Sequence, residues 1–149
     1  MYIASWRDRV HSLAMELPRP SAAKSAEDSL TKRRVVVADD NVYLARTLKM
    51  VLELWGFEAT VVHDGTAALT TLLAGGNAAA LLDLRLPKMG GLQVARELLS
   101  RPEVRPAQLI AMTGSLSNED RTSSLAAGFD HHLIKPVDPN LLRSLLGDP

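Results

Sequence analysis

The side chains of this sequence that could do chemistry each follow a short apolar run. They are three carboxylates, one hydroxyl and one ammonium group, on Asp39, Asp40, Asp83, Thr113 and Lys135. Carboxylates held close together repel one another and need a compensating cation, and hard oxygen ligands of this kind suit Mg²⁺. One carboxylate oxygen would remain free to attack phosphorus, which is the covalent chemistry of aspartyl phosphates. The Lys135 ammonium and the Thr113 hydroxyl could then each bind a phosphoryl oxygen.

These residues are far apart in the sequence, so strands must bring them together. The run 80–82 is apolar on both alternating faces, which is typical of a strand buried on both sides of a parallel sheet, and Pro87 prevents further pairing. From Arg34 onward, strand and helix patterns alternate five times. This alternation predicts an α/β fold: a doubly wound parallel sheet with right-handed crossovers. The carboxyl ends of such strands meet at one edge, where ligands bind.

Apolar runs and capping residues predict the element boundaries. The expected strands are 35–38, 57–62, 80–83, 108–112 and 131–134. The expected caps of the helices are Asp64, Ser117 and Asp138 at the start and Gly56 and Gly128 at the end. Two helices are expected to turn four apolar residues inward, which are Leu92, Ala95, Leu98 and Leu99 in one, and Leu141, Leu142, Leu145 and Leu146 in the last.

The composition excludes several functional classes. Seventeen basic and seventeen acidic residues cancel, which argues against a nucleic-acid partner. Without cysteine, the 149-residue chain has no disulfide framework and no thiolate metal site. No apolar run approaches the roughly 20 residues of a membrane span, and the charged start is no secretory signal. We therefore expect a cytoplasmic protein that has no membrane partner.

Residues 1–33 are expected to form an extension to the domain 34–149. Apolar residues at alternating spacings of three and four predict an amphipathic helix over 3–17, followed by a small, polar and charged linker. Three interpretations remain open. The helix could serve docking or dimerisation, it could be a frayed extension, or it could be the remnant of a preceding domain.

The motifs around the candidate residues resemble the receiver domain of two-component response regulators. The resemblance covers about residues 34–147, and the segment 127–139 looks like receivers that form the last domain of hybrid histidine kinases. The similar stretches are Val-Val-Val-Ala-Asp-Asp-Asn at 35–41, Leu-Leu-Asp-Leu-Arg-Leu-Pro-Lys-Met-Gly-Gly at 81–91, Ala-Met-Thr-Gly at 111–114 and Ile-Lys-Pro at 134–136.

The resemblance implies a five-stranded sheet of flavodoxin-like order and a role for each candidate residue. Asp83 would be the phospho-acceptor. Asp39, Asp40 and Asp83 would hold Mg²⁺ together with the backbone carbonyl of Arg85. Thr113 and Lys135 would contact the phosphoryl group, with Thr113 also acting as a switch.

The resemblance also implies partners. The phosphoryl group would come from a histidine kinase or a histidine phosphotransfer protein, and the output would be contact with an unidentified protein target. The chain would be no enzyme beyond catalysing its own phosphorylation and dephosphorylation. Since the sequence ends directly after the fifth expected helix, we expect a stand-alone receiver without an output domain; homodimerisation is left open.

Three positions depart from the family pattern. The aromatic switch residue three positions before the lysine, usually Tyr or Phe, is His132 here. A half-exposed structural histidine is favoured over a pH sensor at this position. Gly90 stands where receivers often have Asp, which should soften the turn without affecting the chemistry. The third departure is Arg85, a bulky cation two residues after Asp83, which we expect to change the lifetime of the phosphoryl group.

Three other functions fit parts of the sequence. A pseudo-receiver would keep the fold without being phosphorylated, but the acidic residues, Thr113 and Lys135 are all present. A phosphatase of the haloacid dehalogenase type needs a second aspartate where Arg85 stands. A flavodoxin needs a phosphate-binding loop after the first strand, and there Asp39 and Asp40 would repel the phosphate.

Overall fold

The computed structural model describes residues 32–115 and 117–149, so the predicted helix over 3–17 and nearly all of the linker lie outside the described residues. Residues Lys32–Pro149 form one compact unit. Among the helices in these ranges, none is long and apolar enough to cross a membrane.

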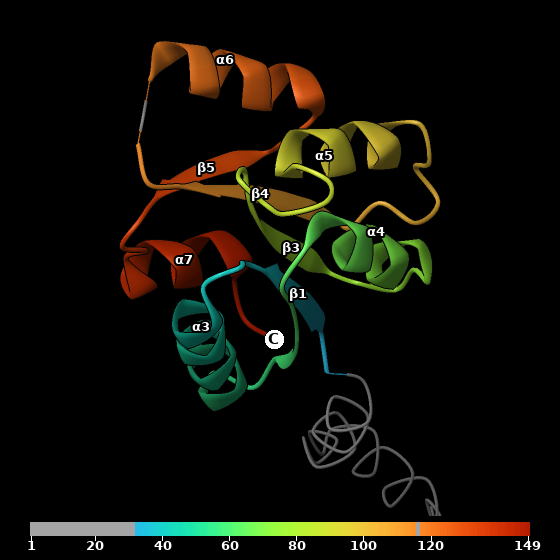
Figure 1. The fold of residues 1–149 in the computed structure, drawn as a ribbon. Coiled ribbons are helices and arrows are strands. Elements are labelled where there is room, and N and C mark those ends of the chain that lie inside the picture. The colour runs from blue at the N-terminus through green and yellow to red at the C-terminus, as the bar shows by residue number, and fades with distance from the viewer. Residues whose placement is uncertain (1–31, 116) are drawn as a thin grey trace, which may run out of the picture. The chain divides into compact units, whose positions relative to one another are not determined.

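The centre of this unit is a five-stranded parallel sheet in the order β2-β1-β3-β4-β5 (Figure 1). The strands are β1 (Arg34–Ala38), β2 (Glu58–Val62), β3 (Ala79–Asp83), β4 (Gln108–Thr113) and β5 (His131–Ile134). This order is that of the flavodoxin-like doubly wound folds, in which the chain starts in the middle of the sheet and winds to both sides. The predicted fold class is therefore confirmed.

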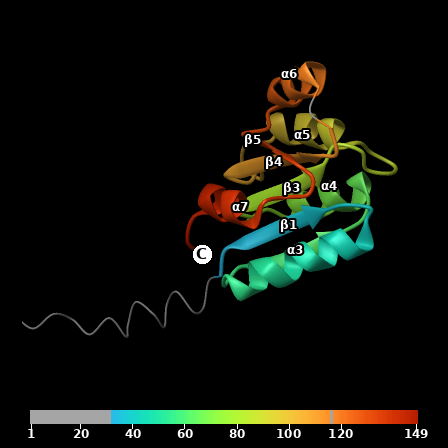
Figure 2. The same cartoon turned by 90° about the vertical axis from the view of Figure 1, so that its left-hand side faces the viewer.

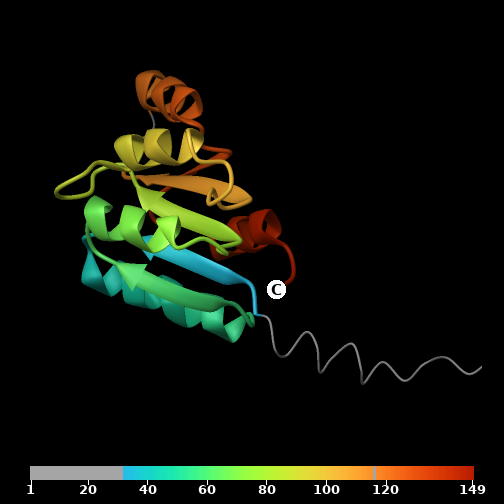
Figure 3. The ribbon, with the colours of Figure 1, turned by 90° about the vertical axis from the view of Figure 1, so that its right-hand side faces the viewer.

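Helices cover both faces of the sheet. They are α3 (Val42–Leu54), α4 (Gly65–Leu73), α5 (Gly91–Leu99), α6 (Asn118–Ala127) and α7 (Pro139–Leu146). Figure 2 shows α3 and α7 on one side of the strands, and Figure 3 shows α4 and α5 side by side on the other. Each side has its own aliphatic core, because successive residues of a buried strand point to opposite faces.

Local signals set four of the five expected helix caps. Asp64, Ser117 and Asp138 each accept a backbone N–H in the first turn of the helix that they precede. Gly128 ends α6 in the left-handed conformation at φ 100°, which costs glycine no steric penalty. The predicted C-cap Gly56 is wrong by one residue: the C-cap of α3 is Trp55, and Gly56 follows it in the left-handed region at φ 98°.

Two predicted core positions are wrong. Leu99 is 54% exposed and Leu141 is 47% exposed. Each adjoins a buried residue, Leu98 and Leu142 respectively, and one step along a helix turns a side chain by about 100°. In α5 the buried stripe runs instead through Val94, Ala95 and Leu98.

Strand β2 starts one residue later than expected. The N–H of Phe57 donates to the carbonyl of Leu52 at 3.0 Å and closes the end of α3, so it is not available to the sheet. Strand β4 ends one residue later than expected, at Thr113, because that residue still pairs with Ile134 of β5. The residue that carries the candidate hydroxyl is thus held within the sheet.

Candidate functional site

The ends of the neighbouring strands β1 and β3 bring the predicted carboxylates together. Asp39 and Asp40 follow β1, and Asp83 is the last residue of β3. One carboxylate oxygen from each of the three lies within 4.8 Å of the others. Asp39 is fully buried, Asp83 is 6% exposed and Asp40 is exposed. The cluster therefore has a buried base and one open side.

Lys135 lies against two of these carboxylates. Its Nζ donates a hydrogen bond of 2.6 Å to Asp83 Oδ2 and forms an ion pair of 2.7 Å with Asp39 Oδ2. Burial alone would lower the pKa of Lys135, but the carboxylates of Asp39 and Asp83 outweigh it, so that the pKa is raised and the ammonium stays charged. Its backbone N–H bonds the Thr113 carbonyl at 2.7 Å, which fixes β5 beside β4.

The charge balance of the cluster fits a divalent cation. One ammonium group leaves two of the three negative charges uncompensated. The buried Asp39 Oδ2 lies 2.7 Å from the Lys135 ammonium, which also contacts Asp83, so this one cation is shared between two carboxylates. A buried carboxylate oxygen with a free lone pair is costly unless a cation satisfies it. The oxygen donors present suit Mg²⁺.

A cleft of about 470 Å³ opens beside the carboxylates. Its lining residues are Asp40, Asp83, Arg85, Gly114, Ser115 and Lys135. The Arg85 side chain is exposed there, while its backbone N–H donates to Asp83 Oδ1 at 2.9 Å. Asp83 is thus held through both carboxylate oxygens at the wall of an accessible space.

Thr113 reaches the same edge of the sheet but does not line the cleft. Its side chain is buried, and its hydroxyl donates to the Ser115 carbonyl at 2.9 Å while accepting the Ser115 N–H at 3.4 Å. The hydroxyl would have to give up this local turn to reach a group bound at Asp83. Ser115 itself lines the cleft, although no motif in the sequence marks it as a candidate.

His132 lies half-buried between β5 and α6. Its Nδ1 is 3.0 Å from the Ser124 hydroxyl, which donates its own proton to the Arg121 carbonyl. The buried Nε2 of His132 finds no partner among the described residues. Burial, followed by the positive charge of Arg121, lowers the pKa of His132.

One residue near the cluster was missed by the sequence analysis. The Nδ1 atom of His63, which directly follows β2, lies 2.9 Å from the carbonyl oxygen of Asp39. Its position after a strand end was a signal of the kind used for the other candidates. It lacked the apolar approach of a fully buried strand, since β2 is an edge strand with mixed burial.

Comparisons with known proteins agree with this geometry. The family model described as the response regulator receiver domain matches residues 35–147. The DNA-binding response regulator MtrA of Mycolicibacterium paratuberculosis is 37% identical over 111 residues, which are 74% of this chain and 48% of MtrA. The chain thus spans about half the length of the curated relatives that it matches.

Solved structures show the same fold. A CheY-like receiver domain protein from Methanospirillum hungatei JF-1 is 29% identical with a TM-score of 0.69, and the match covers 77% of this chain and 91% of that one. The receiver domain of sensor histidine kinase PA1611 from Pseudomonas aeruginosa PAO1 is 28% identical with a TM-score of 0.71, covering 78% and 95%. That crystal structure has a magnesium ion coordinated in the active site cleft.

Proposed function

This chain belongs to the response regulator receiver domain family, and from that premise we propose that it takes a phosphoryl group onto Asp83. The donor is the phosphohistidine of a histidine kinase or of a histidine phosphotransfer protein. A carboxylate oxygen of Asp83 bonds to phosphorus while the bond from phosphorus to the histidine nitrogen breaks. The electron pair stays on that nitrogen, which then takes a proton from water.

The surroundings of Asp83 carry this proposal. Its carboxylate ends a buried strand, lies at the wall of the cleft, and is oriented by the Arg85 N–H and by the Lys135 ammonium. Once the phosphoryl group is attached, the ammonium can transfer its hydrogen bond to a phosphoryl oxygen. Positioning and charge neutralisation are the main contributions that a protein makes to phosphoryl transfer.

Asp39, Asp40 and Asp83 are proposed to hold Mg²⁺, with the backbone carbonyl of Arg85 as a further ligand. The close approach of the three carboxylates and the negative charge that the single Lys135 ammonium leaves uncompensated support this set. When bound, the metal neutralises the charge of the carboxylates and of the incoming phosphoryl group. The magnesium-bound relative has a receiver fold similar to this one.

Thr113 and His132 are proposed as the switch pair. Thr113 would exchange its bond with Ser115 for one to a phosphoryl oxygen, and this would move the end of β4. His132 lies on the neighbouring strand, paired with Ala111, so it can respond to such a movement. Its contact with Ser124 connects the change to α6.

The proposed output is a protein contact. The formal net charge of zero favours a protein target over nucleic acid, and the chain is proposed to be cytoplasmic without a membrane partner. The only chemistry assigned to the chain is the gain and loss of its own phosphoryl group. Dimerisation in the phosphorylated state is compatible with this role.

Intact mass spectrometry after incubation with a small-molecule phosphodonor tests the proposal. We expect a gain of one phosphoryl group that needs Mg²⁺ and disappears in Asp83→Asn. The matched control is Asp148→Asn, which alters an exposed carboxylate near the other end of the molecule and should leave the gain intact. No gain in a folded protein that binds Mg²⁺ would instead support an interaction module that is never phosphorylated.

A further inference from the structure

The turn between β2 and α4 touches both loops that carry the acidic cluster. On one side, His63 Nδ1 lies 2.9 Å from the Asp39 carbonyl oxygen, in the loop after β1. On the other side, the N–H of Gly65 donates to the Pro87 carbonyl at 3.1 Å, in the loop after β3. Residues 63–65 are therefore a bridge between the two halves of the site.

The bond from His63 extends the pairing of β1 with β2. The last backbone bond between these strands runs from the Asp39 N–H to the Val62 carbonyl at 3.1 Å. Beyond it the chain turns away into α4, and the imidazole takes over as the partner of the next carbonyl. Because a carbonyl only accepts, Nδ1 must donate, which fixes the tautomer of a neutral ring.

The bonded carbonyl belongs to the peptide that joins Asp39 to Asp40. The Asp39 side chain has its own supports, since it is buried, accepts the Asn41 N–H at 2.9 Å and faces Lys135. The Asp40 side chain is exposed and accepts no hydrogen bond from the residues that the structure describes. Its position therefore depends on the backbone that His63 holds.

Residues 64 and 65 of the bridge pack closely against the loop after β3. A side chain at position 65 would collide with the Met89 carbonyl, so only glycine allows this close approach. Next to it, Lys88 Nζ lies 3.4 Å from Asp64 Oδ2, and Asp64 also caps α4. The imidazole thus extends from a fixed base, although the ring itself is exposed.

We propose that His63 is a positioning residue for the divalent-cation site. Its Nδ1–H orients the Asp39–Asp40 peptide so that both carboxylates face the metal, and it does not touch the metal itself. This inference rests on the proposed function, because it assumes that the carboxylates bind Mg²⁺. Partners in the outer shell of a metal site commonly influence affinity in this way.

Magnesium titrations followed by NMR amide shifts test the inference without any phosphodonor. We expect His63→Ala to weaken Mg²⁺ binding about tenfold, at the lower end of the range for outer-shell partners. His63→Asn should retain most of the affinity, because its amide can donate from nearly the position of Nδ1. His131→Ala is the matched control, since His131 begins β5 at the opposite edge of the sheet.

The outcomes separate this inference from the proposed function. Equal affinity of wild type and His63→Ala, or equal weakening in His63→Asn, would overturn the positioning role while leaving the metal site intact. If wild type binds no Mg²⁺, the metal site and the positioning role both fall. Should His63→Ala fail to fold, His63→Leu replaces it as the variant that fills the space without a donor.

Discussion

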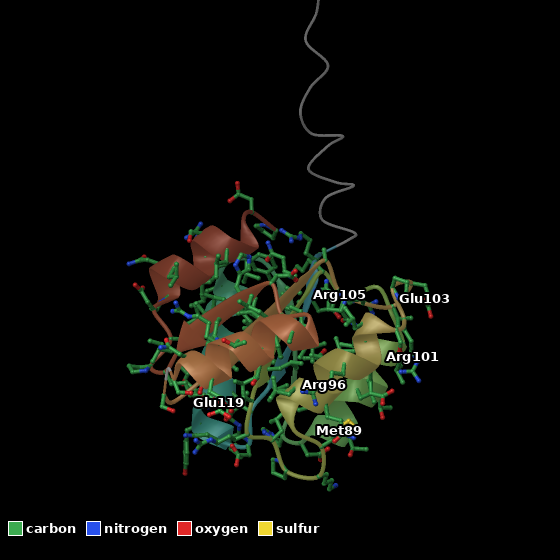
Figure 4. All side chains as sticks on the ribbon, turned by 90° about the horizontal axis from the view of Figure 1, so that it is seen from above. Met89, Arg96, Arg101, Glu103, Arg105 and Glu119 are labelled. Atoms are coloured by element: carbon green, nitrogen blue, oxygen red, sulfur yellow. The ribbon has the colours of Figure 1, made fainter. Side chains whose placement is uncertain are left out.

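The two ends of the parallel sheet use charge in opposite ways. At the amino ends of the strands, three arginine side chains donate hydrogen bonds to backbone carbonyls that are distant in the sequence. Arg33 binds those of Leu146 and Asp148 at the end of the chain. Arg34 binds those of Gly75 and Gly76, and Arg105 binds that of Gly128. At the carboxyl ends, three carboxylates face one ammonium. Figure 4 shows Arg105 toward the amino ends of the strands and Met89, in the loop after β3, toward their carboxyl ends.

The charged residues at the amino ends of the strands stabilise the fold, whereas those at the carboxyl ends form the functional site. Each arginine at the amino end satisfies carbonyls that a loop or helix end leaves without partners, so its charge stabilises the fold. The carboxyl end keeps an excess of negative charge that destabilises the protein alone and becomes favourable only with a cation. Residues whose mutual repulsion lowers the stability of the protein are expected at functional sites. Substitutions at the two ends should therefore have different consequences.

The largest effect is expected for Lys135→Met. Loss of a charge-assisted hydrogen bond of about 1.5–3 kcal/mol should slow phosphorylation of Asp83 roughly 10- to 100-fold. Mg²⁺ should bind more tightly than in wild type, since the competing ammonium is gone. Rates by intact mass and affinities by titration check both, with Lys49→Met on the exposed face of α3 as the control. Weaker Mg²⁺ binding would contradict the charge balance described for this end.

At the opposite end, Arg105→Ala should lower the free energy of unfolding by about 1–3 kcal/mol. The substitution removes the bonds to the Gly128 carbonyl and to Asp130, and Asp130 also accepts the N–H of Leu109 at the start of β4. Denaturant unfolding measures the change, and Arg96→Ala, at an exposed position of α5, should stay within about 0.5 kcal/mol of wild type. If folded Arg105→Ala is phosphorylated more slowly than wild type, the charges at the amino ends of the strands also affect function, which contradicts the proposed separation of roles.

A smaller effect is expected for Arg85→Ala. The guanidinium lies exposed at the cleft beside Asp83, where it can bind a phosphoryl oxygen and hinder the approach of water. Its removal should speed dephosphorylation severalfold without affecting stability. Loss of phosphorylated mass over time measures the rate, with Arg96→Ala as the control. Equal rates would show that this cation does not act on the phosphoryl group.

The smallest expected effect is a pH dependence from His132. Because the pKa of His132 is lowered by burial and by Arg121, the unfolded chain binds a proton more readily than the folded one. The free energy of unfolding should rise as the pH increases from below the folded pKa to above the unfolded value of 6.5. Urea titrations of wild type and His132→Phe across this range test it. If the free energy of unfolding of His132→Phe changes with pH as steeply as that of wild type, other groups cause the pH dependence.

Much of this structure could be predicted because its signals are local. Apolar runs mark the buried strands, and the caps at Asp64, Ser117 and Asp138 mark the helix starts. Parallel topology then requires the strand ends to meet, which is why the proximity of Asp39, Asp40 and Asp83 could be predicted from residues more than 40 positions apart.

The rest depended on side-chain direction and on contacts between loops. The exposure of Leu99 and Leu141 follows from the phase of each helix against the sheet, and four neighbouring leucines or alanines do not fix that phase. The hydroxyl of Thr113 turns to Ser115 because a buried hydroxyl takes the nearest acceptor. The bond from His63 to Asp39 forms only where two turns meet in space, so no sequence spacing predicts it.

The most direct test of the account is to locate the phosphoryl group. The protein is phosphorylated with a small-molecule donor in Mg²⁺, the acyl phosphate is reduced with borohydride, and the modified residue is identified by peptide mass spectrometry. We expect modification at Asp83 alone, and none when Mg²⁺ is removed by chelation. Modification at Asp39 or Asp40, or labelling of Asp83 that does not require the metal, would contradict it.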